Sequence, residues 1–346
     1  MPAEGARPVV VNARAALRVE GGGVERVARE LARRLPALAP DRYRVAAPPG
    51  ALAHGAGHAW EQLVLPVAAR GARLILSPAN TGPVTTRRGV TFVHDLAPLV
   101  EPAWYGRAYG AWHRTLLRAL ARRARLLLAP SAATRDQLLE LLGVDPRRTA
   151  VVPLGVDPEL GARADPERLR ARLGLARPYV LAVGTDVARK NIGLLERAAP
   201  LLAQAGLEAV VAGGARAYMS AEGGPATPAL RRLGFVAEGD LPSLYAGAAA
   251  FALPSLYEGF GLPCLEAMAC GTPVVTTPRG GLPEACGDAA LYAQPDDVEG
   301  FARACVAAAT DATERERLIA AGAQRARTLT WDATARAVDA ALAPLL

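Results

Sequence analysis

The 346-residue sequence is poor in metal-binding and redox side chains, with only four cysteines and four histidines. The cysteines form no C-x-x-C pair and few histidines lie near them, which argues against a zinc site. We therefore expect ordinary buried thiols rather than ligands. The four are Cys264, Cys270, Cys286 and Cys305.

Long apolar runs are also missing. No run of about 18 uncharged apolar residues occurs, so the sequence predicts no membrane-spanning helix. Residues 1–8 lack the apolar core of a signal peptide, and we expect a cytoplasmic protein. Because 51% of the residues are hydrophobic, disorder by composition is excluded, and the length favours about two domains.

Positive charge is in excess, at +7, and it comes from arginine, because Lys190 is the single lysine. A basic balance suits a nucleotide-phosphate ligand or an anionic membrane surface. No recognised nucleic-acid-binding module accompanies the arginines, so we expect no nucleic-acid partner.

Short apolar runs alternate with amphipathic helical patterns along the whole chain, which is typical of parallel sheets covered on both faces. The pattern restarts after a stretch rich in Gly, Pro and Asp at 155–164. The predicted fold class is therefore α/β, with two doubly wound Rossmann-like domains facing a central cleft. We expect domains at 1–160 and 161–328, and a C-terminal helix at 329–346 that returns to the first domain.

Unusual polar residues cluster at the predicted ends of strands, where ligands bind in such sheets. The clearest segment, 254–268, follows a buried strand and opens a helix. Gly259 and Gly261 allow close backbone approach, and Pro263 suits a first helical turn. The helix N-terminus favours a diphosphate, and Glu258 and Glu266 can flank the same ligand.

Three further strand-end segments carry candidate residues. Arg189 and Lys190 lie side by side after an apolar strand and suggest a phosphate clamp. A glycine turn at 20–27, including Gly22 and Gly23, is weak evidence by itself. A lone histidine such as His94 is more often structural, although its position before Asp95 at a strand end favours a role in binding.

Glu258 to Val274 resembles the E-G-F-G-L-P-x-L-E-A-M-A-x-G-x-P-V pattern of the retaining family-4 (group 1) glycosyltransferases, which have the GT-B fold. The loop 183–191 is similar to their G-(R/T)-x-x-x-(R/E)-K-(G/N) loop, with Thr185 where many members have Arg. Residues 20–27 are similar to their G-G-x-E-R-V loop, and His94–Asp95 to their H-D pair. The stretch from His94 to Trp104 resembles bacterial mannosyltransferase-like members.

The resemblance implies a nucleoside-diphosphate sugar as donor, linked to guanosine or uridine, and a retaining transfer to a hydroxyl of a glycan or lipid-linked acceptor. It implies that Glu266 binds the ribose and that Glu258 contacts the donor sugar. The implied donor-binding residues are Gly22, Gly23, Thr185, Phe235, Phe260, Gly261, Leu262 and Glu266, the catalytic ones His94, Arg189, Lys190 and Glu258, and those on the acceptor side Asp95, Trp104 and Tyr105.

Neither a cofactor nor a metal is expected. The leaving diphosphate would be stabilised by Arg189, Lys190 and the helix N-terminus near Leu262. No D-x-D follows a strand, and the pair Asp296–Asp297 has the position of a helix cap.

Alternatives remain open from the sequence. Another GT-B enzyme, such as a nucleotide-sugar epimerase or a sugar phosphorylase, would share the fold, and so would an inactive nucleotide-sugar-binding protein. The arginine-rich amphipathic helix predicted at 105–125 is either a solvated basic face or a peripheral contact with the anionic inner face of a membrane.

Overall fold

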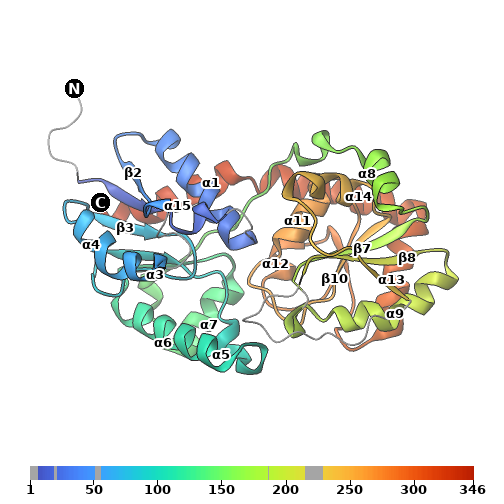
Figure 1. The fold of residues 1–346 in the computed structure, drawn as a ribbon, viewed down its shortest axis with the longest axis horizontal. Coiled ribbons are helices and arrows are strands. Elements are labelled where there is room, and N and C mark those ends of the chain that lie inside the picture. The colour runs from blue at the N-terminus through green and yellow to red at the C-terminus, as the bar shows by residue number, and fades with distance from the viewer. Residues whose placement is uncertain (1–6, 19–21, 51–55, 186, 215–228) are drawn as a thin grey trace. The chain divides into compact units, whose positions relative to one another are not determined.

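The computed structural model describes residues 7–18, 22–50, 56–185, 187–214 and 229–346. Its described part divides into two compact units. Unit 1 comprises Met1–Val100, Gly110–Leu154 and Trp331–Leu346, and unit 2 comprises Glu101–Tyr109 and Gly155–Thr330. Each unit holds one six-stranded parallel sheet (Figure 1).

The sheet of unit 1 has the strand order β2-β1-β3-β4-β5-β6, and every pair in it is parallel. Its strands are β1 (Val9–Asn12), β2 (Tyr43–Ala46), β3 (Leu74–Ser77), β4 (Gly89–Phe92), β5 (Leu126–Ala129) and β6 (Thr149–Val151). β1, β3, β4 and β5 are buried along their whole length, as the near-continuous apolar runs predict.

The helices of unit 1 cover both faces of this sheet (Figure 1). They are α1 (Gly23–Leu38), α3 (Gly57–Ala59), α4 (Leu65–Ala68), α5 (Ala97–Val100), α6 (Arg107–Arg123), α7 (Ala132–Leu142) and α15 (Trp331–Leu342). A π-helical turn at Trp60–Val64 joins α3 to α4. Because parallel crossovers are right-handed, the 57–68 segment, α6 and α7 share one face, whereas α1 and α15 pack together on the other.

The sheet of unit 2 has the order β12-β11-β10-β7-β8-β9, again parallel throughout. Its strands are β7 (Tyr179–Val183), β8 (Glu208–Ala212), β9 (Leu230–Arg232), β10 (Ala250–Leu253), β11 (Val274–Thr276) and β12 (Ala290–Tyr292). Its helices are α8 (Pro166–Leu173), α9 (Ile192–Gln204), α10 (Leu241–Ala246), α11 (Leu262–Ala269), α12 (Leu282–Cys286), α13 (Val298–Thr310) and α14 (Ala312–Thr328).

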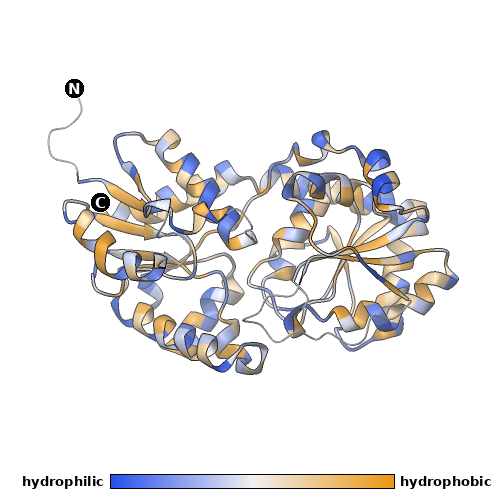
Figure 2. Ribbon diagram, in the orientation of Figure 1, coloured by the Kyte–Doolittle hydropathy of each residue, from blue (hydrophilic) through white to orange (hydrophobic). Residues whose placement is uncertain are grey.

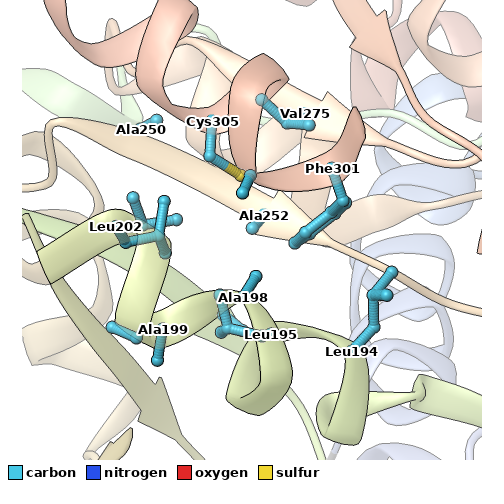
Figure 3. Close-up of a cluster of buried hydrophobic side chains, with 14 of the residues drawn as sticks. Leu194, Leu195, Ala198, Ala199, Leu202, Ala250, Ala252, Val275, Phe301 and Cys305 are labelled. Carbon is cyan, nitrogen blue, oxygen red and sulfur yellow. The ribbon is translucent and has the colours of Figure 1, made fainter. Parts of the chain in front are cut away.

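One core cluster of unit 2 lies between its sheet and the helices α9 and α13, which pack against each other. Figure 3 shows Leu195, Ala198 and Leu202 of α9 near Phe301 and Cys305 of α13. Apolar residues colour the strands of both sheets, and polar residues colour the outer sides of the helices (Figure 2). The two doubly wound α/β halves predicted from the sequence are confirmed.

The chain does not divide simply at residue 160, because the nine residues Glu101–Tyr109 group with unit 2. The contact between the rings of Trp104 and Tyr257, 6.3 Å apart, is one physical reason for it. No helix within the described residues combines the length and the apolar character needed to cross a membrane.

Core packing in unit 2 predicts unequal effects for two Phe-to-Ala replacements. Phe301 is fully buried in the α9–α13 core, whereas Phe235 is 71% exposed. We expect Phe301→Ala to lower the free energy of unfolding by about 3–5 kcal/mol, because it leaves a cavity. Phe235→Ala should change it by about 0.5 kcal/mol or less. Denaturant unfolding of both variants measures the difference, and equal losses would contradict this description of the core.

Candidate functional site

The candidate site lies at the carboxyl ends of β7 and β10, the central strands of unit 2. β7 pairs with β8 on one side and with β10 on the other, so the strand order reverses between β7 and β10. Ligands of doubly wound sheets bind at such a switch point. The two strongest sequence segments, 184–191 and 254–262, are the loops that leave these two strands.

A buried carboxylate holds the two loops together. Arg189 donates from Nη1 to Oε2 of Glu258 at 2.8 Å, and Lys190 donates from Nζ to Oε1 at 2.6 Å. Ser255 donates from Oγ to the same Oε1 at 2.7 Å. Glu258 thus has both oxygens engaged by cations, and the sheet brings together three of the four predicted catalytic residues.

The charge state of Glu258 follows from this arrangement. Burial alone raises the pKa of its carboxyl, but the nearby Arg189 and Lys190 charges and the hydrogen bonds from Lys190 and Ser255 outweigh burial and lower the pKa to about 2. Glu258 is therefore a carboxylate at neutral pH, which keeps two adjacent cations in a buried loop electrically balanced.

Backbone contacts fix the shape of both loops. Leu256 donates its N–H to the carbonyl of Arg189 at 2.9 Å, and Arg189 donates to the carbonyl of Tyr257 at 2.8 Å. Asn191 has a left-handed backbone (φ +50°), and its side-chain amide donates to the carbonyls of Pro254 and Pro295. The cation-bearing loop is thereby fastened to the loop that carries Glu258.

Gly280 is required where the chain after β11 passes the same loop. Its φ is +55°, and a Cβ built on it would lie 2.2 Å from the carbonyl oxygen of Glu258. The neighbouring Gly281 donates its N–H to that carbonyl at 2.8 Å. The loop that follows β11 therefore packs against the backbone of Glu258 as a third loop.

Helix α11 begins where the sequence predicts. Gly261 precedes it with φ +121°, and Pro263 lies in its first turn. The predicted donor-binding residues Phe260, Gly261 and Leu262 are thus at a helix N-terminus, where backbone N–H groups and the helix dipole favour an anion. Glu266 lies one turn further along and is buried, and it accepts a hydrogen bond from the Tyr245 hydroxyl at 2.8 Å.

The remaining predicted residues of unit 2 lie on the surrounding loops. Thr185 follows β7, and Phe235 is exposed after β9. Trp104 lies against Tyr257, next to Glu258, and the ring of Tyr105 stacks on that of Tyr109 at 5.6 Å. Asp186 lies outside the described residues.

Unit 1 holds the other predicted residues. His94 follows β4 and is buried, with its ring stacked on Phe92 at 4.7 Å. Its Nε2 lies 2.7 Å from the carbonyl oxygen of Pro78, so Nε2 carries the proton, and burial lowers the pKa of the ring. Asp95 accepts from the N–H of Ala97 at 3.0 Å.

The glycine turn of unit 1 leads directly into α1. Gly22 is the N-cap of this helix, Gly23 is its first residue, and the N–H of Gly22 donates to the Glu25 carboxylate at 2.8 Å. Glu20 and Gly21 of the same predicted loop lie outside the described residues.

Sequence reasoning gave no role to Ser255, Asn191 or Tyr245, although each contacts a predicted site residue or fixes its loop. Ser255 and Asn191 lie within the two segments 254–268 and 183–191, whereas Tyr245 lies outside every motif.

The described part of the chain contains no group of three or more His, Cys, Asp or Glu side chains placed to hold a metal ion. Asp297 accepts from the N–H of Gly300 at 2.8 Å and begins α13, which confirms its predicted capping position. The absence of a metal requirement stays a prediction.

Two family models match the chain. Residues 177–311 match the model described as glycosyl transferases group 1, and residues 84–160 match the model of glycosyltransferase family 4. The first includes the whole Arg189–Lys190–Glu258 cluster, and the second includes His94 and Asp95.

Curated relatives carry names of the same kind. The chain is 33% identical over 204 residues to the O-antigen chain mannosyltransferase B of Escherichia coli, covering 56% of this chain and 54% of that protein. It is 32% identical over 278 residues to a D-inositol 3-phosphate glycosyltransferase of Thermomonospora curvata, covering 72% and 64%. The matched part thus spans about half the length of the first of these relatives.

Solved structures share the fold over nearly the whole chain. Sucrose-phosphate synthase from Thermosynechococcus elongatus has a TM-score of 0.74 at 19% identity, covering 98% of this chain and 99% of that one. Anabaena HepE in complex with UDP and glucose has a TM-score of 0.72 at 20% identity, covering 97% and 99%. WaaG, a glycosyltransferase of lipopolysaccharide biosynthesis, has a TM-score of 0.69. The predicted GT-B fold is confirmed.

The depressed pKa of Glu258 predicts a pH-dependent contribution to stability. A carboxyl whose pKa falls from 4.5 to about 2 on folding stabilises the folded state above its unfolded pKa, and this contribution is lost as the pH falls toward about 2. We expect Glu258→Gln to be less stable than wild type at neutral pH. The difference between them should shrink between pH 4.5 and pH 2, which thermal unfolding across this range measures. A constant difference would contradict the ion pairing.

The close packing of Gly280 against the Glu258 carbonyl predicts a difference between two Gly-to-Ala variants. Gly280 and Gly271 both have positive φ, but a Cβ at Gly271 would meet no atom within 4 Å. We expect Gly271→Ala to cost about 1–2 kcal/mol from backbone strain alone. Gly280→Ala should cost clearly more and should also weaken nucleotide binding, since it displaces Glu258. Unfolding and nucleotide titration of both variants check this, and equal behaviour would rule out the support that the third loop gives.

Proposed function

Because this chain belongs to the glycosyltransferases of group 1 and family 4, we propose that it transfers a hexose, mannose or another, from a nucleoside-diphosphate sugar to a hydroxyl of a glycan or lipid-linked acceptor, with retention of anomeric configuration. The observation that carries the proposal is the buried cluster of Arg189, Lys190 and Glu258 beside the N-terminus of α11, at the switch point of unit 2.

The cluster fits the chemistry of diphosphate departure. When the bond between sugar and diphosphate breaks, negative charge grows on the leaving oxygen. Arg189 and Lys190 provide fixed positive charge in a buried loop, where electrostatic stabilisation is stronger than in water. Glu258 holds both cations in position and, as a carboxylate, can support the positive charge that develops on the sugar.

The proposed contacts with the donor follow from where each residue lies relative to the cluster of Arg189, Lys190 and Glu258. We propose that backbone N–H groups of Phe260, Gly261 and Leu262 bind the phosphates and that Glu266 binds the ribose hydroxyls. The exposed ring of Phe235 suits stacking on a base. Gly22, Gly23 and Thr185 are proposed to complete the donor site, with His94 near the sugar and Asp95, Trp104 and Tyr105 on the acceptor side.

Two bases, guanine and uracil, are proposed for the nucleotide of the donor. A solved relative is titled as a complex with UDP, and two of the curated relatives are named mannosyltransferases. Mannose and glucose donors differ in base, so we propose a GDP- or UDP-linked donor. Since Arg189 and Lys190 supply the charge, we propose that no metal ion is required.

Two other functions predict different behaviour. A nucleotide-sugar epimerase would change the donor without an acceptor, and a sugar phosphorylase would need inorganic phosphate. An inactive binding protein would bind the donor and release no product. The buried ion pair of Lys190 with Glu258, together with the buried Glu266 on α11, favours the transferase.

Nucleotide binding is the first test of this proposal. We expect GDP or UDP, but not CMP, to raise the melting temperature equally with magnesium or with EDTA. A ligand that binds only the folded state adds about 2.7 kcal/mol at a hundredfold excess over its Kd. Arg189→Ala should reduce the shift, whereas Arg303→Ala, on the exposed face of α13, should not. No shift with any diphosphate would contradict the donor site.

We also propose a peripheral contact of unit 1 with an anionic membrane on the cytoplasmic side. Leu63 and Val67, in the segment that precedes β3, are 66% and 62% exposed. The segment shares a face of the sheet with the arginine-rich α6. No acidic residue occurs at 62–94 or at 102–135, so Leu63, Val67 and α6 form a basic and apolar part of this face.

Membrane contact predicts selective loss of vesicle binding. We expect the wild type to sediment with vesicles of phosphatidylcholine and phosphatidylglycerol, and less with phosphatidylcholine alone. Leu63→Ser/Val67→Ser should reduce sedimentation strongly. Leu17→Ser/Leu38→Ser, a pair of exposed apolar residues elsewhere on unit 1, should leave it unchanged. Equal sedimentation of both double variants would contradict the proposed surface.

A further inference from the structure

Unit 1 has its own switch point, and a buried polar network occupies it. β1 pairs with β2 on one side and with β3 on the other, so the strand order reverses between β1 and β3. Asn12 ends β1 and Ser77 ends β3, and the amide of Asn12 donates to Ser77 Oγ at 3.2 Å. Polar side chains at this position of a doubly wound sheet point to a ligand.

The centre of the network is Glu61, which is 1% exposed. Its Oε1 accepts from Asn12 Nδ2 at 2.6 Å and from Thr81 Oγ1 at 3.1 Å, and Arg14 Nε lies 3.4 Å away. Arg14 also donates to Thr81 Oγ1 at 2.8 Å. Three residues from two segments thus hold one carboxylate oxygen in place.

The second oxygen of Glu61 is buried and lies beside His58. Oε2 has no hydrogen-bond partner among the described residues and lies 3.7 Å from Nδ1 of His58, which has none there either. A shift of somewhat less than 1 Å would make a normal hydrogen bond between them. An Nδ1–H directed at Glu61 leaves Nε2 of His58 as an acceptor for another group.

His58 and its neighbours reach the surface. The His58 side chain is 40% exposed, and its ring meets that of Trp112 edge-on at 6.2 Å. Trp112 is 47% exposed. Burial lowers the pKa of the neighbouring His113 to about 4; His58 and Arg14 act in the same direction and Asp95 opposes them, so His113 is uncharged at neutral pH.

We propose that His58 and Trp112, backed by Glu61, form a binding subsite for a hexose ring of the acceptor. The exposed indole offers a flat apolar face for the C–H face of a pyranose, and Nε2 of His58 accepts a hydrogen bond from a ring hydroxyl. Glu61 does not touch the sugar but positions the imidazole. The inference rests on the proposed transferase function, and it is confined to residues of unit 1.

Sugar binding tests the subsite without knowledge of the natural acceptor. The probes are the methyl α-pyranosides of mannose, glucose and galactose, observed by saturation-transfer NMR on the full chain with UDP or GDP present. We expect at least one glycoside to bind the wild type, and His58→Gln and Trp112→Ala each to weaken it about tenfold. Leu141→Ala, an apolar residue of α7 with 49% exposure, should leave binding unchanged.

Failure of the subsite and failure of the transferase proposal are distinguishable in the same samples. Nucleotide binding without glycoside binding, or equal glycoside binding by all variants, would overturn the subsite alone. Loss of nucleotide binding as well would overturn both proposals.

The positioning role of Glu61 has a separate readout. We expect ¹⁵N NMR of the His58 imidazole to show the Nδ1–H tautomer in the wild type, and Glu61→Gln to shift the population toward Nε2–H. An unchanged tautomer in a folded Glu61→Gln variant would overturn that role. Should this variant fail to fold, the exposed His58→Gln variant still decides the subsite.

Discussion

The ion pairing of Glu258 with Arg189 and Lys190 is the constraint on which the candidate donor site depends. It joins loops that are 68 residues apart in sequence, and it exists because β7 and β10 are neighbours in a parallel sheet. A buried carboxylate without these cations would be protonated, and the cations without it would repel each other. The charge balance in this loop therefore fixes the positions of Arg189 and Lys190, which is the arrangement that the proposed diphosphate site needs.

Both units carry a polar cluster at the switch point of their parallel sheet, but the side chains in the two clusters differ. In unit 2 the switch point gathers positive charge around a carboxylate next to a helix N-terminus, which suits an anionic ligand. In unit 1 it gathers Asn12, Glu61 and Thr81 beside exposed rings, which suits a neutral polyhydroxyl ligand. A donor and an acceptor of a glycosyl transfer differ in this way, and the two proposals accordingly assign the nucleotide sugar to the cluster of unit 2 and an acceptor hexose to the network of unit 1.

Much of the fold could be predicted from the sequence. The two α/β halves, a C-terminal helix within 329–346 and a helix that begins near Pro263 agree with prediction, because apolar runs alternate with clear turn residues. Three-residue edge strands such as β9 and β12 carry almost no periodic signal. The pairing of Glu258 with Lys190 could not be predicted from spacing. Glu61 was missed because it lies in a π-helical turn, which turns a charged side chain inward against the ordinary helical period.

The most direct measurement is the rate of nucleoside-diphosphate release from GDP-mannose and UDP-glucose by wild type, Glu258→Gln and Glu299→Gln. Glu299 is an exposed residue of α13 and serves as the matched control. We expect Glu299→Gln to keep the wild-type rate, whereas Glu258→Gln should lose about 10²- to 10³-fold in rate while still binding the nucleotide. A Glu258→Gln enzyme as fast as its control would contradict the central role of the cluster.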